Sequence, residues 1–112
     1  THKLTVSGSI GINGTVQQIS DERFKSNVQD IDNPLSRILS SRGVTFDMGG
    51  KKQVGVIAQE IQKTIPEVIS EDNQGYLSVS YSNIVGVLIE AIKEQDKKIA
   101  SLEAKLDNLL DK

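Results

Sequence analysis

Hydrophobic positions near the start of the chain follow a two-residue period. Leu4, Val6, Ile10 and Ile12 share one register within residues 3–14, and glycines and small polar residues lie between them. Such alternation predicts a β-strand. The glycines favour a strand that packs closely against copies of itself, as in the stem of a fibre, although an ordinary edge strand fits the same residues equally well.

Two short helices are predicted in the middle of the chain. The first begins at Pro34, with Asp32 or Asn33 as its N-cap, and runs to about Ser41. The second is amphipathic and is stopped by Pro66. Its isoleucines recur at i, i+4 spacing, at Ile57, Ile61 and Ile65.

Two β-hairpins are predicted around these helices. Residues 44–48 alternate as a strand, and we expect them to pair with residues 53–57 about a turn at 49–52 that contains two glycines. Further on, residues 68–69 and 77–79 flank a stretch of turn-forming polar residues and glycine. This second stretch predicts a second hairpin.

A long helix is predicted from about Ser82 to the end of the chain. Its apolar residues repeat every seven positions over almost four heptads, so the stripe needs cover from this domain or from other copies. The a positions are Val85, Ile92, Ile99 and Leu106, and the d positions are Leu88, Gln95, Leu102 and Leu109. The stripe from Ile99 onward extends beyond what a domain of this size can cover. We therefore expect self-association, and isoleucine at a positions is compatible with three strands.

These elements predict an α+β fold. A small mixed domain of short strands and helices precedes a long C-terminal helix that forms a trimeric coiled coil, and a strand of a fibre stem lies at the N-terminal end. The 112 residues suffice for one compact domain, but with two Phe, two Tyr and no Trp its core is thin. Oligomerisation is a natural way to bury more surface, and we expect a homotrimer.

The charge distribution narrows the range of partners. The formal net charge is −2, and lysines are interspersed with acidic residues rather than gathered in a basic patch. We therefore expect no nucleic-acid partner and no attraction to an anionic membrane surface. No apolar run approaches the length that spans a bilayer, so we also expect no membrane association.

Candidate chemistry is limited by the residue types that the chain lacks. It has no Cys, and its single histidine is His2, so neither a Ser-His-Asp triad nor a site with several Cys or His metal ligands can form within one chain. We expect no metal and no cofactor. A serine activated by lysine remains possible, and Ser20 and Lys25 stand five residues apart. This spacing alone is weak evidence, because Ser followed by Lys within a few residues is more typical of a solvated polar turn.

The surrounding sequence resembles a known family. The segment SDERFK at 20–25 is followed by Asn27 and Val28, by GVIAQEIQKTIPEVI at 55–69, and by a closing helix that starts with a Tyr-x-x-Ile pattern. These motifs resemble the self-cleaving C-terminal intramolecular chaperone of phage endosialidases, tailspikes, tail fibres and neck appendages, which is shared with a membrane-anchored myelin transcription factor of animals. The resemblance covers residues 20–112.

The resemblance implies a homotrimeric chaperone that folds the preceding part of its own chain. It is then released by cleavage before the motif serine, here at the Ile19-Ser20 bond, with Ser20 as nucleophile and Lys25 as general base. Residues 1–19 would then end the fibre or tailspike, and residues 20–112, with the coiled coil at 82–112, would be the chaperone. The resemblance further implies assembly in the cytoplasm of a bacterial host and loss of the chaperone from the mature virion protein.

This chemistry places demands on the local structure. Ser20 Oγ reaches the carbonyl of Ile19 only in an unusual backbone geometry, and a lysine accepts a proton only when it is neutral, which requires burial or a nearby cation. Assembly of the trimer can supply both. Asp21 is either a local organiser of this site or a plain turn residue. Arg23 is either the cation near Lys25 or a solvated charge.

A non-enzymatic alternative fits the same patterns. In it, the chain is a coiled-coil trimerisation module, and the serine and lysine have no chemical role. The two hypotheses differ in whether Ser20→Ala prevents the appearance of a smaller fragment. A Ser-Lys protease that acts on other proteins is disfavoured, because so short a chain shows no separate substrate-binding region.

Overall fold

The computed structural model describes residues 2–111, which fall into two compact units, Thr1–Asp30 and Ile31–Lys112. Within residues 2–30 the regular element is a single 3-10 turn, η1 (Glu22–Phe24). The strand predicted for residues 3–14 is absent from this single chain. A strand forms only by pairing its backbone with another strand, and residues 2–30 contain none.

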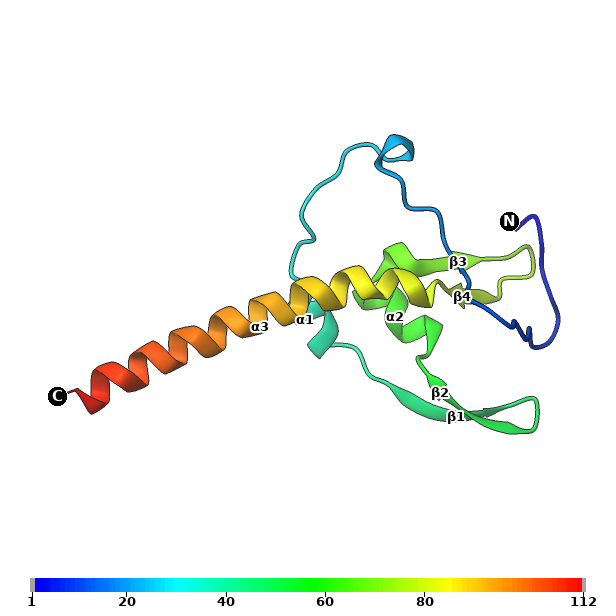
Figure 1. Ribbon diagram of the computed structural model, residues 1–112. Coiled ribbons are helices and arrows are strands. Elements are labelled where there is room, and N and C mark those ends of the chain that lie inside the picture. Colours follow the sequence, from blue (N-terminus) through cyan, green and yellow to red (C-terminus); the bar gives the residue numbers. More distant parts are fainter. Residues whose placement is uncertain (1, 112) are drawn as a thin grey trace. The chain divides into compact units, whose positions relative to one another are not determined.

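The second unit mixes helices with short antiparallel strands, which confirms the predicted α+β class (Figure 1). Two separate two-stranded sheets, β1-β2 and β3-β4, stand beside three helices. The elements are α1 (Pro34–Leu39), β1 (Val44–Met48), β2 (Lys51–Gly55), α2 (Ala58–Thr64), the 3-10 turn η2 (Pro66–Val68), β3 (Ile69–Glu71), β4 (Leu77–Val79) and α3 (Tyr81–Leu110).

The first hairpin has a tighter turn than predicted. Gly49 and Gly50 have φ angles of 61° and 72°, so they form a two-residue turn in which both central residues adopt positive φ. Met48 pairs with Lys51 as a result, and the second strand is Lys51–Gly55 rather than residues 53–57. The predicted four-residue turn was wrong because two adjacent glycines already satisfy the geometry that reverses the chain.

The other predicted elements are present. The second hairpin pairs Ile69 with Val79 and Glu71 with Leu77. The first helix has Asn33 at its N-cap position, in the left-handed region at φ 51° and without a capping hydrogen bond from its side chain. Pro66 follows the end of α2 and opens η2, as its missing N–H and fixed φ favour.

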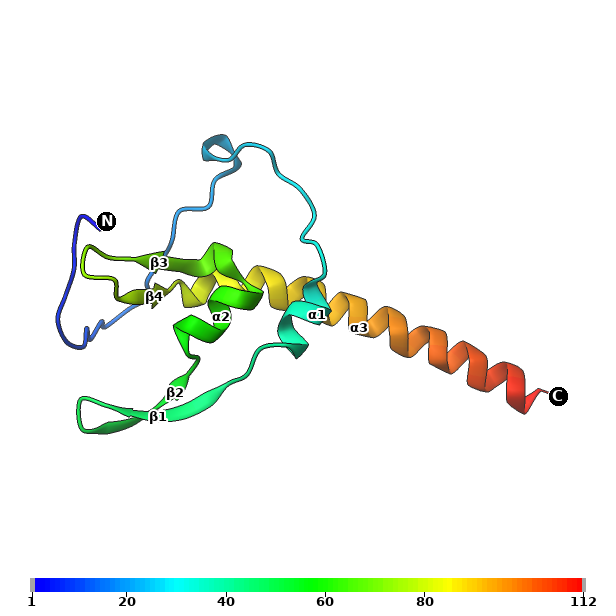
Figure 2. The same cartoon turned by 180° about the vertical axis from the view of Figure 1, so that it is seen from behind.

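The core of the second unit lies where α2, η2 and α1 meet the first half of α3 (Figure 2). Ile61 of α2 and Ile65, which follows the end of α2, are each 1% exposed, and full burial of such a side chain contributes roughly 1.5–3 kcal/mol. The remaining buried apolar side chains are Leu35, Val68, Val87 and Ala91. Their small number agrees with the thin core that the composition predicts.

The long helix α3 presents two different apolar faces. Its own domain buries Val87 and Ala91 and partly buries Ile84. These residues do not belong to the a and d positions of the heptad repeat. The apolar a and d residues are between 40% and 69% exposed, and they are Val85, Leu88, Ile92, Ile99, Leu102, Leu106 and Leu109. In this chain the predicted seam is therefore uncovered along its whole length.

Candidate functional site

The candidate dyad lies on a short turn whose geometry is set by backbone hydrogen bonds. The N–H of Phe24 donates to the carbonyl of Asp21 at 3.1 Å, and the N–H of Lys25 donates to the carbonyl of Glu22 at 3.0 Å. Asp21 also caps the turn, because its Oδ1 accepts the N–H of Arg23 at 2.9 Å. The chain therefore reverses between residue 20 and residue 25.

This reversal brings Ser20 and Lys25 together. The Nζ atom of Lys25 donates to Ser20 Oγ at 2.5 Å. In an extended chain, residues five positions apart lie up to about 17 Å apart, so the contact depends on the turn. The distance lies within the reach over which a positioned base takes a proton from a hydroxyl.

Arg23 and Asp21 form a two-point ion pair on the same turn. Arg23 Nε donates to Asp21 Oδ1 at 3.0 Å, and Arg23 Nη2 donates to Asp21 Oδ2 at 2.8 Å. These side-chain bonds, followed by the bond from the backbone N–H of Arg23, hold the pKa of Asp21 below its usual range. Arg23 is 83% exposed, so it is both solvated and paired with a carboxylate. This pairing was not predicted from the sequence.

The dyad is open to solvent in the single chain. Ser20 and Lys25 are exposed, and the Ile19 side chain is 83% exposed. The non-glycine residues with positive φ in the described range 2–111 are Asn27 and Asn33, so left-handed strain does not lie at Ile19 or Ser20. One chain alone thus supplies the contact between nucleophile and base, but neither the burial nor this form of backbone strain.

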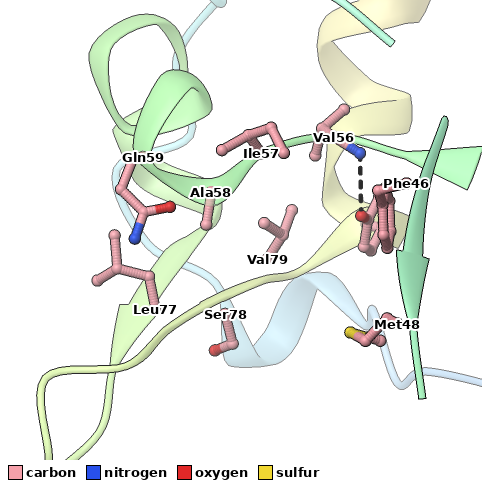
Figure 3. A pocket seen from close by; sticks show the side chains of 10 residues that line it. Phe46, Met48, Val56, Ile57, Ala58, Gln59, Leu77, Ser78 and Val79 are labelled. Atoms are coloured by element: carbon pink, nitrogen blue, oxygen red, sulfur yellow. Dashed lines mark hydrogen bonds between the residues drawn. The ribbon is translucent and has the colours of Figure 1, made fainter. Parts of the chain in front are cut away.

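The Gly55–Glu60 segment serves the packing of the second unit. A Cβ on Gly55 would lie 2.5 Å from Tyr81 Oη, so only glycine allows this close approach. The N–H of Val56 donates to the same oxygen at 3.2 Å (Figure 3). Glu60 accepts two bonds of 2.9 Å from Arg42, which lower the pKa of this carboxyl. The segment therefore ties the end of β2 to the start of α3 and α2 to the region before β1.

An open, mostly apolar pocket of about 380 Å³ lies between the two hairpins of the second unit (Figure 3). Its apolar lining comes from Phe46, Met48, Val56, Ile57, Ala58, Leu77 and Val79. Its polar lining comes from Gln59, Ser78 and Tyr81. No carboxylate, lysine or histidine is among the lining residues, so the pocket offers no acid–base pair. The pocket was not predicted from the sequence, because its walls come from elements scattered along the chain.

Residues 2–111 contain no group of three His, Cys, Asp or Glu side chains arranged to hold a metal ion. None of their helices is long and apolar enough to cross a bilayer.

Comparison with known proteins yields one family and several relatives. Residues 20–70 match the family model described as chaperone of endosialidase, which is named as a peptidase family. The long tail fiber protein Gp37 of Enterobacteria phage K3 is 35% identical over 98 residues, and that of phage T2 is 35% identical over 98 residues. The Gp37 protein of phage M1 is 31% identical over 99 residues.

The aligned region is a small part of each relative. It covers 78% of this chain in all three cases, but only 8% of the K3 protein, 7% of the T2 protein and 39% of the M1 protein. The chain therefore spans far less than the length of the relatives that it matches. The dyad turn lies at the first residues of the family match.

Proposed function

Residues 20–70 belong to the chaperone of endosialidase family, and we propose that the chain is the intramolecular chaperone of a phage tail fibre or tailspike. It drives trimerisation and folding of the preceding part of its own chain. It then releases itself by cutting the Ile19-Ser20 bond once, in cis. The precursor assembles in the cytoplasm of the bacterial host, and residues 20–112 leave the mature virion protein.

The observation that carries this proposal is the 2.5 Å contact between Lys25 Nζ and Ser20 Oγ. When the amine of Lys25 is neutral, it takes the proton of Ser20 Oγ, and the oxygen attacks the carbonyl carbon of Ile19. The C–N bond between Ile19 and Ser20 then breaks. Lys25 returns the proton to the departing amine of Ser20, which leaves residue 19 esterified to Ser20 Oγ.

Water completes the reaction by hydrolysing this ester. The products are a free carboxylate on Ile19, a free amine on Ser20 and a restored Ser20 hydroxyl. The overall change is addition of one water molecule across one peptide bond, so neither a metal nor a cofactor is required. Backbone N–H groups are the expected donors to the oxyanion of the tetrahedral intermediate.

Assembly supplies what a single chain lacks. A lysine amine accepts a proton only when it is neutral, and dry or cationic surroundings favour the neutral form. The uncovered heptad seam of α3 is the surface through which three copies associate. Because α3 uses Val87 and Ala91 for its own domain, the seam remains available without unfolding that domain. Cleavage thereby follows assembly.

The charges beside the seam favour parallel helices. Asp96 and Glu103 occupy e positions, whereas Lys98 and Lys105 occupy g positions. In a parallel coiled coil, g residues face the e residues of the next heptad on a neighbouring helix, so Lys98 meets Glu103 of a neighbouring copy. Antiparallel helices would place like charges together. Parallel copies also bring the N-terminal ends of the three α3 helices together at one end of the assembly.

Intact mass spectrometry of freshly made protein tests the proposal, with light scattering to report the oligomeric state. Wild type should yield fragments 1–19 and 20–112. Ser20→Ala and Lys25→Ala should stay intact, and Ser26→Ala, which removes a neighbouring serine hydroxyl outside the dyad, should cleave like wild type. All four should be trimeric.

The competing function is a non-enzymatic trimerisation module, which the solvent exposure of the dyad favours. It has the same seam and the same oligomer. An uncut wild-type trimer would leave this module as the function and eliminate self-cleavage. Equal cleavage of wild type and Ser20→Ala would likewise eliminate Ser20 as the nucleophile.

A further inference from the structure

The turn that carries the dyad has no buried side chain to hold it in place. Residues 22–24 form a single 3-10 turn, and within it Phe24 is 81% exposed. An isolated helical turn gains too few hydrogen bonds to be stable by itself in water. Local polar contacts must therefore define its geometry, and these contacts converge on one carboxylate.

That carboxylate is Asp21, directly after the nucleophile, and it accepts three hydrogen bonds from Arg23. The backbone N–H of Arg23 lies 2.9 Å from Oδ1, Nε lies 3.0 Å from Oδ1, and Nη2 lies 2.8 Å from Oδ2. A planar guanidinium matches a carboxylate in this two-point geometry, which a lysine ammonium cannot reproduce. The ion pair therefore joins residue 21 to residue 23 and stabilises the first half of the turn.

The Arg23–Asp21 ion pair also changes the electrostatic environment of Lys25. The titratable neighbours on this turn are Asp21, Glu22 and Arg23. An unpaired carboxylate close to a lysine favours the protonated amine, which cannot act as a base. Arg23 occupies both oxygens of Asp21, so this carboxylate is neutralised beside the dyad.

We infer that Arg23 is a positioning residue for self-cleavage. Its guanidinium clamps Asp21, and the clamp holds the turn that places Lys25 Nζ against Ser20 Oγ. This inference rests on the proposed function, since it concerns the rate of the same reaction. The hydrogen bonds of Arg23 go to Asp21, so Arg23 acts on the dyad through Asp21.

A pulse–chase measurement of cleavage after cell-free synthesis of the full chain tests the clamp. Arg23→Gln and Asp21→Asn should each slow cleavage at least about tenfold, because displacement of a catalytic group by an ångström costs up to about a hundredfold. Arg23→Lys, which keeps the charge but loses the fork, should lie between Arg23→Gln and wild type. The double variant should cleave no more slowly than the slower single variant, since both substitutions break the same Arg23–Asp21 ion pair.

Arg42→Gln is the matched control. Arg42 makes the same two-point contact with Glu60, at 2.9 Å for both bonds, but within the second unit. It should cleave within about twofold of wild type, because neither Arg42 nor Glu60 belongs to the turn that holds Ser20 and Lys25. Wild-type rates for Arg23→Gln, or fully additive slowing in the double variant, would overturn the clamp. Failure of wild type itself to cleave would instead overturn the proposed function.

A titration distinguishes positioning from a general effect on folding. In the uncleaved Ser20→Ala chain, carbon NMR of the Asp21 carboxyl should report a pKa below the usual range, because Arg23 stabilises the ionised form. Adding Arg23→Gln should raise that pKa toward its ordinary value while light scattering reports the same oligomer. An Asp21 pKa that does not change with Arg23→Gln would show that no clamp exists and would overturn the inference.

Discussion

Lysine at position 25 has to gain and lose a proton during the proposed reaction. Arginine carries a similar positive charge and reaches a similar distance, but its guanidinium is not deprotonated in proteins. Lys25→Arg should therefore slow cleavage at least about a hundredfold, the lower bound of what a positioned general base contributes. Mass spectrometry of the chain over time, with light scattering to show an unchanged oligomer, measures this loss.

The control for this variant is Lys93→Arg, on the outer face of α3. Lys93 pairs with Glu90 at 3.2 Å, and arginine can keep that pair. Cleavage at the wild-type rate is expected for the control. If Lys25→Arg cleaved equally fast, Lys25 would be acting as a fixed charge rather than as a base.

Ser20 and Lys25 could be identified from the sequence, but the hydrogen bonds that position them could not. Ser20 and Lys25 were recognisable because the residue types for other hydrolytic mechanisms are missing and because the motif resembles a family. Their 2.5 Å contact, and the fork between Arg23 and Asp21, depend on how a three-residue turn closes. Spacing in a sequence does not specify that closure, since several turn types fit five residues.

The junction of β2, α2 and α3 depends on one glycine. A Cβ at Gly55 would lie 2.5 Å from Tyr81 Oη and 3.2 Å from the Cε1 atom of Phe46. Gly55→Ala should therefore displace the Tyr81 ring and break its hydrogen bond with the N–H of Val56. We expect it to lower the free energy of unfolding by about 1–3 kcal/mol, as for other overpacked sites. Urea denaturation of the chain in a Ser20→Ala background measures this change.

Gly43→Ala is the matched control for this substitution. Gly43 precedes β1, and a Cβ at this position would have no atom within 4 Å of it. Gly43 is also not among the glycines with positive φ. Its replacement should change stability by no more than about 0.5 kcal/mol. Equal stability of the two alanine variants would show that Tyr81 moves aside freely and that the junction is not tightly packed.

The periodicity of apolar residues predicted helices and strands better than it predicted individual side-chain contacts. The i, i+4 isoleucines identified α2, and two of them, Ile61 and Ile65, are among the most deeply buried side chains. The turn of the first hairpin was misplaced because a pattern of alternation does not reveal where pairing begins. The strand predicted for residues 3–14 is absent for a related reason. Alternation indicates which residues would lie on one face of a strand, but it does not identify a second strand to pair with.

For the whole molecule, the two faces of α3 separate folding of a chain from association of chains. The heptad pattern predicted the exposed seam, but it could not show that the helix would pack on its own domain through Val87 and Ala91 instead. Only the position of the core in the structure shows which face of α3 packs on its own domain. It means that a substitution in the seam beyond the core can abolish association while leaving the fold of the single chain intact.

Ile99→Asp tests this separation. Ile99 is an a position, is 48% exposed in the single chain, and lies beyond the part of α3 that meets the core. A carboxylate repeated at the centre of a trimer would place three like charges in an apolar seam, so the variant should be monomeric by light scattering, with circular dichroism showing retained helix and strand. If cleavage requires assembly, this monomer should also remain uncut.

Ala104→Asp supplies the comparison, because it introduces the same carboxylate five residues later at an outer f position of the heptad. It should stay trimeric and cleave normally. The two variants together decide how the dyad is activated. A cleaved Ile99→Asp monomer would mean that one chain buries and strains its own dyad after all, whereas an uncut monomer beside a cleaved Ala104→Asp trimer would make self-release a consequence of completed assembly.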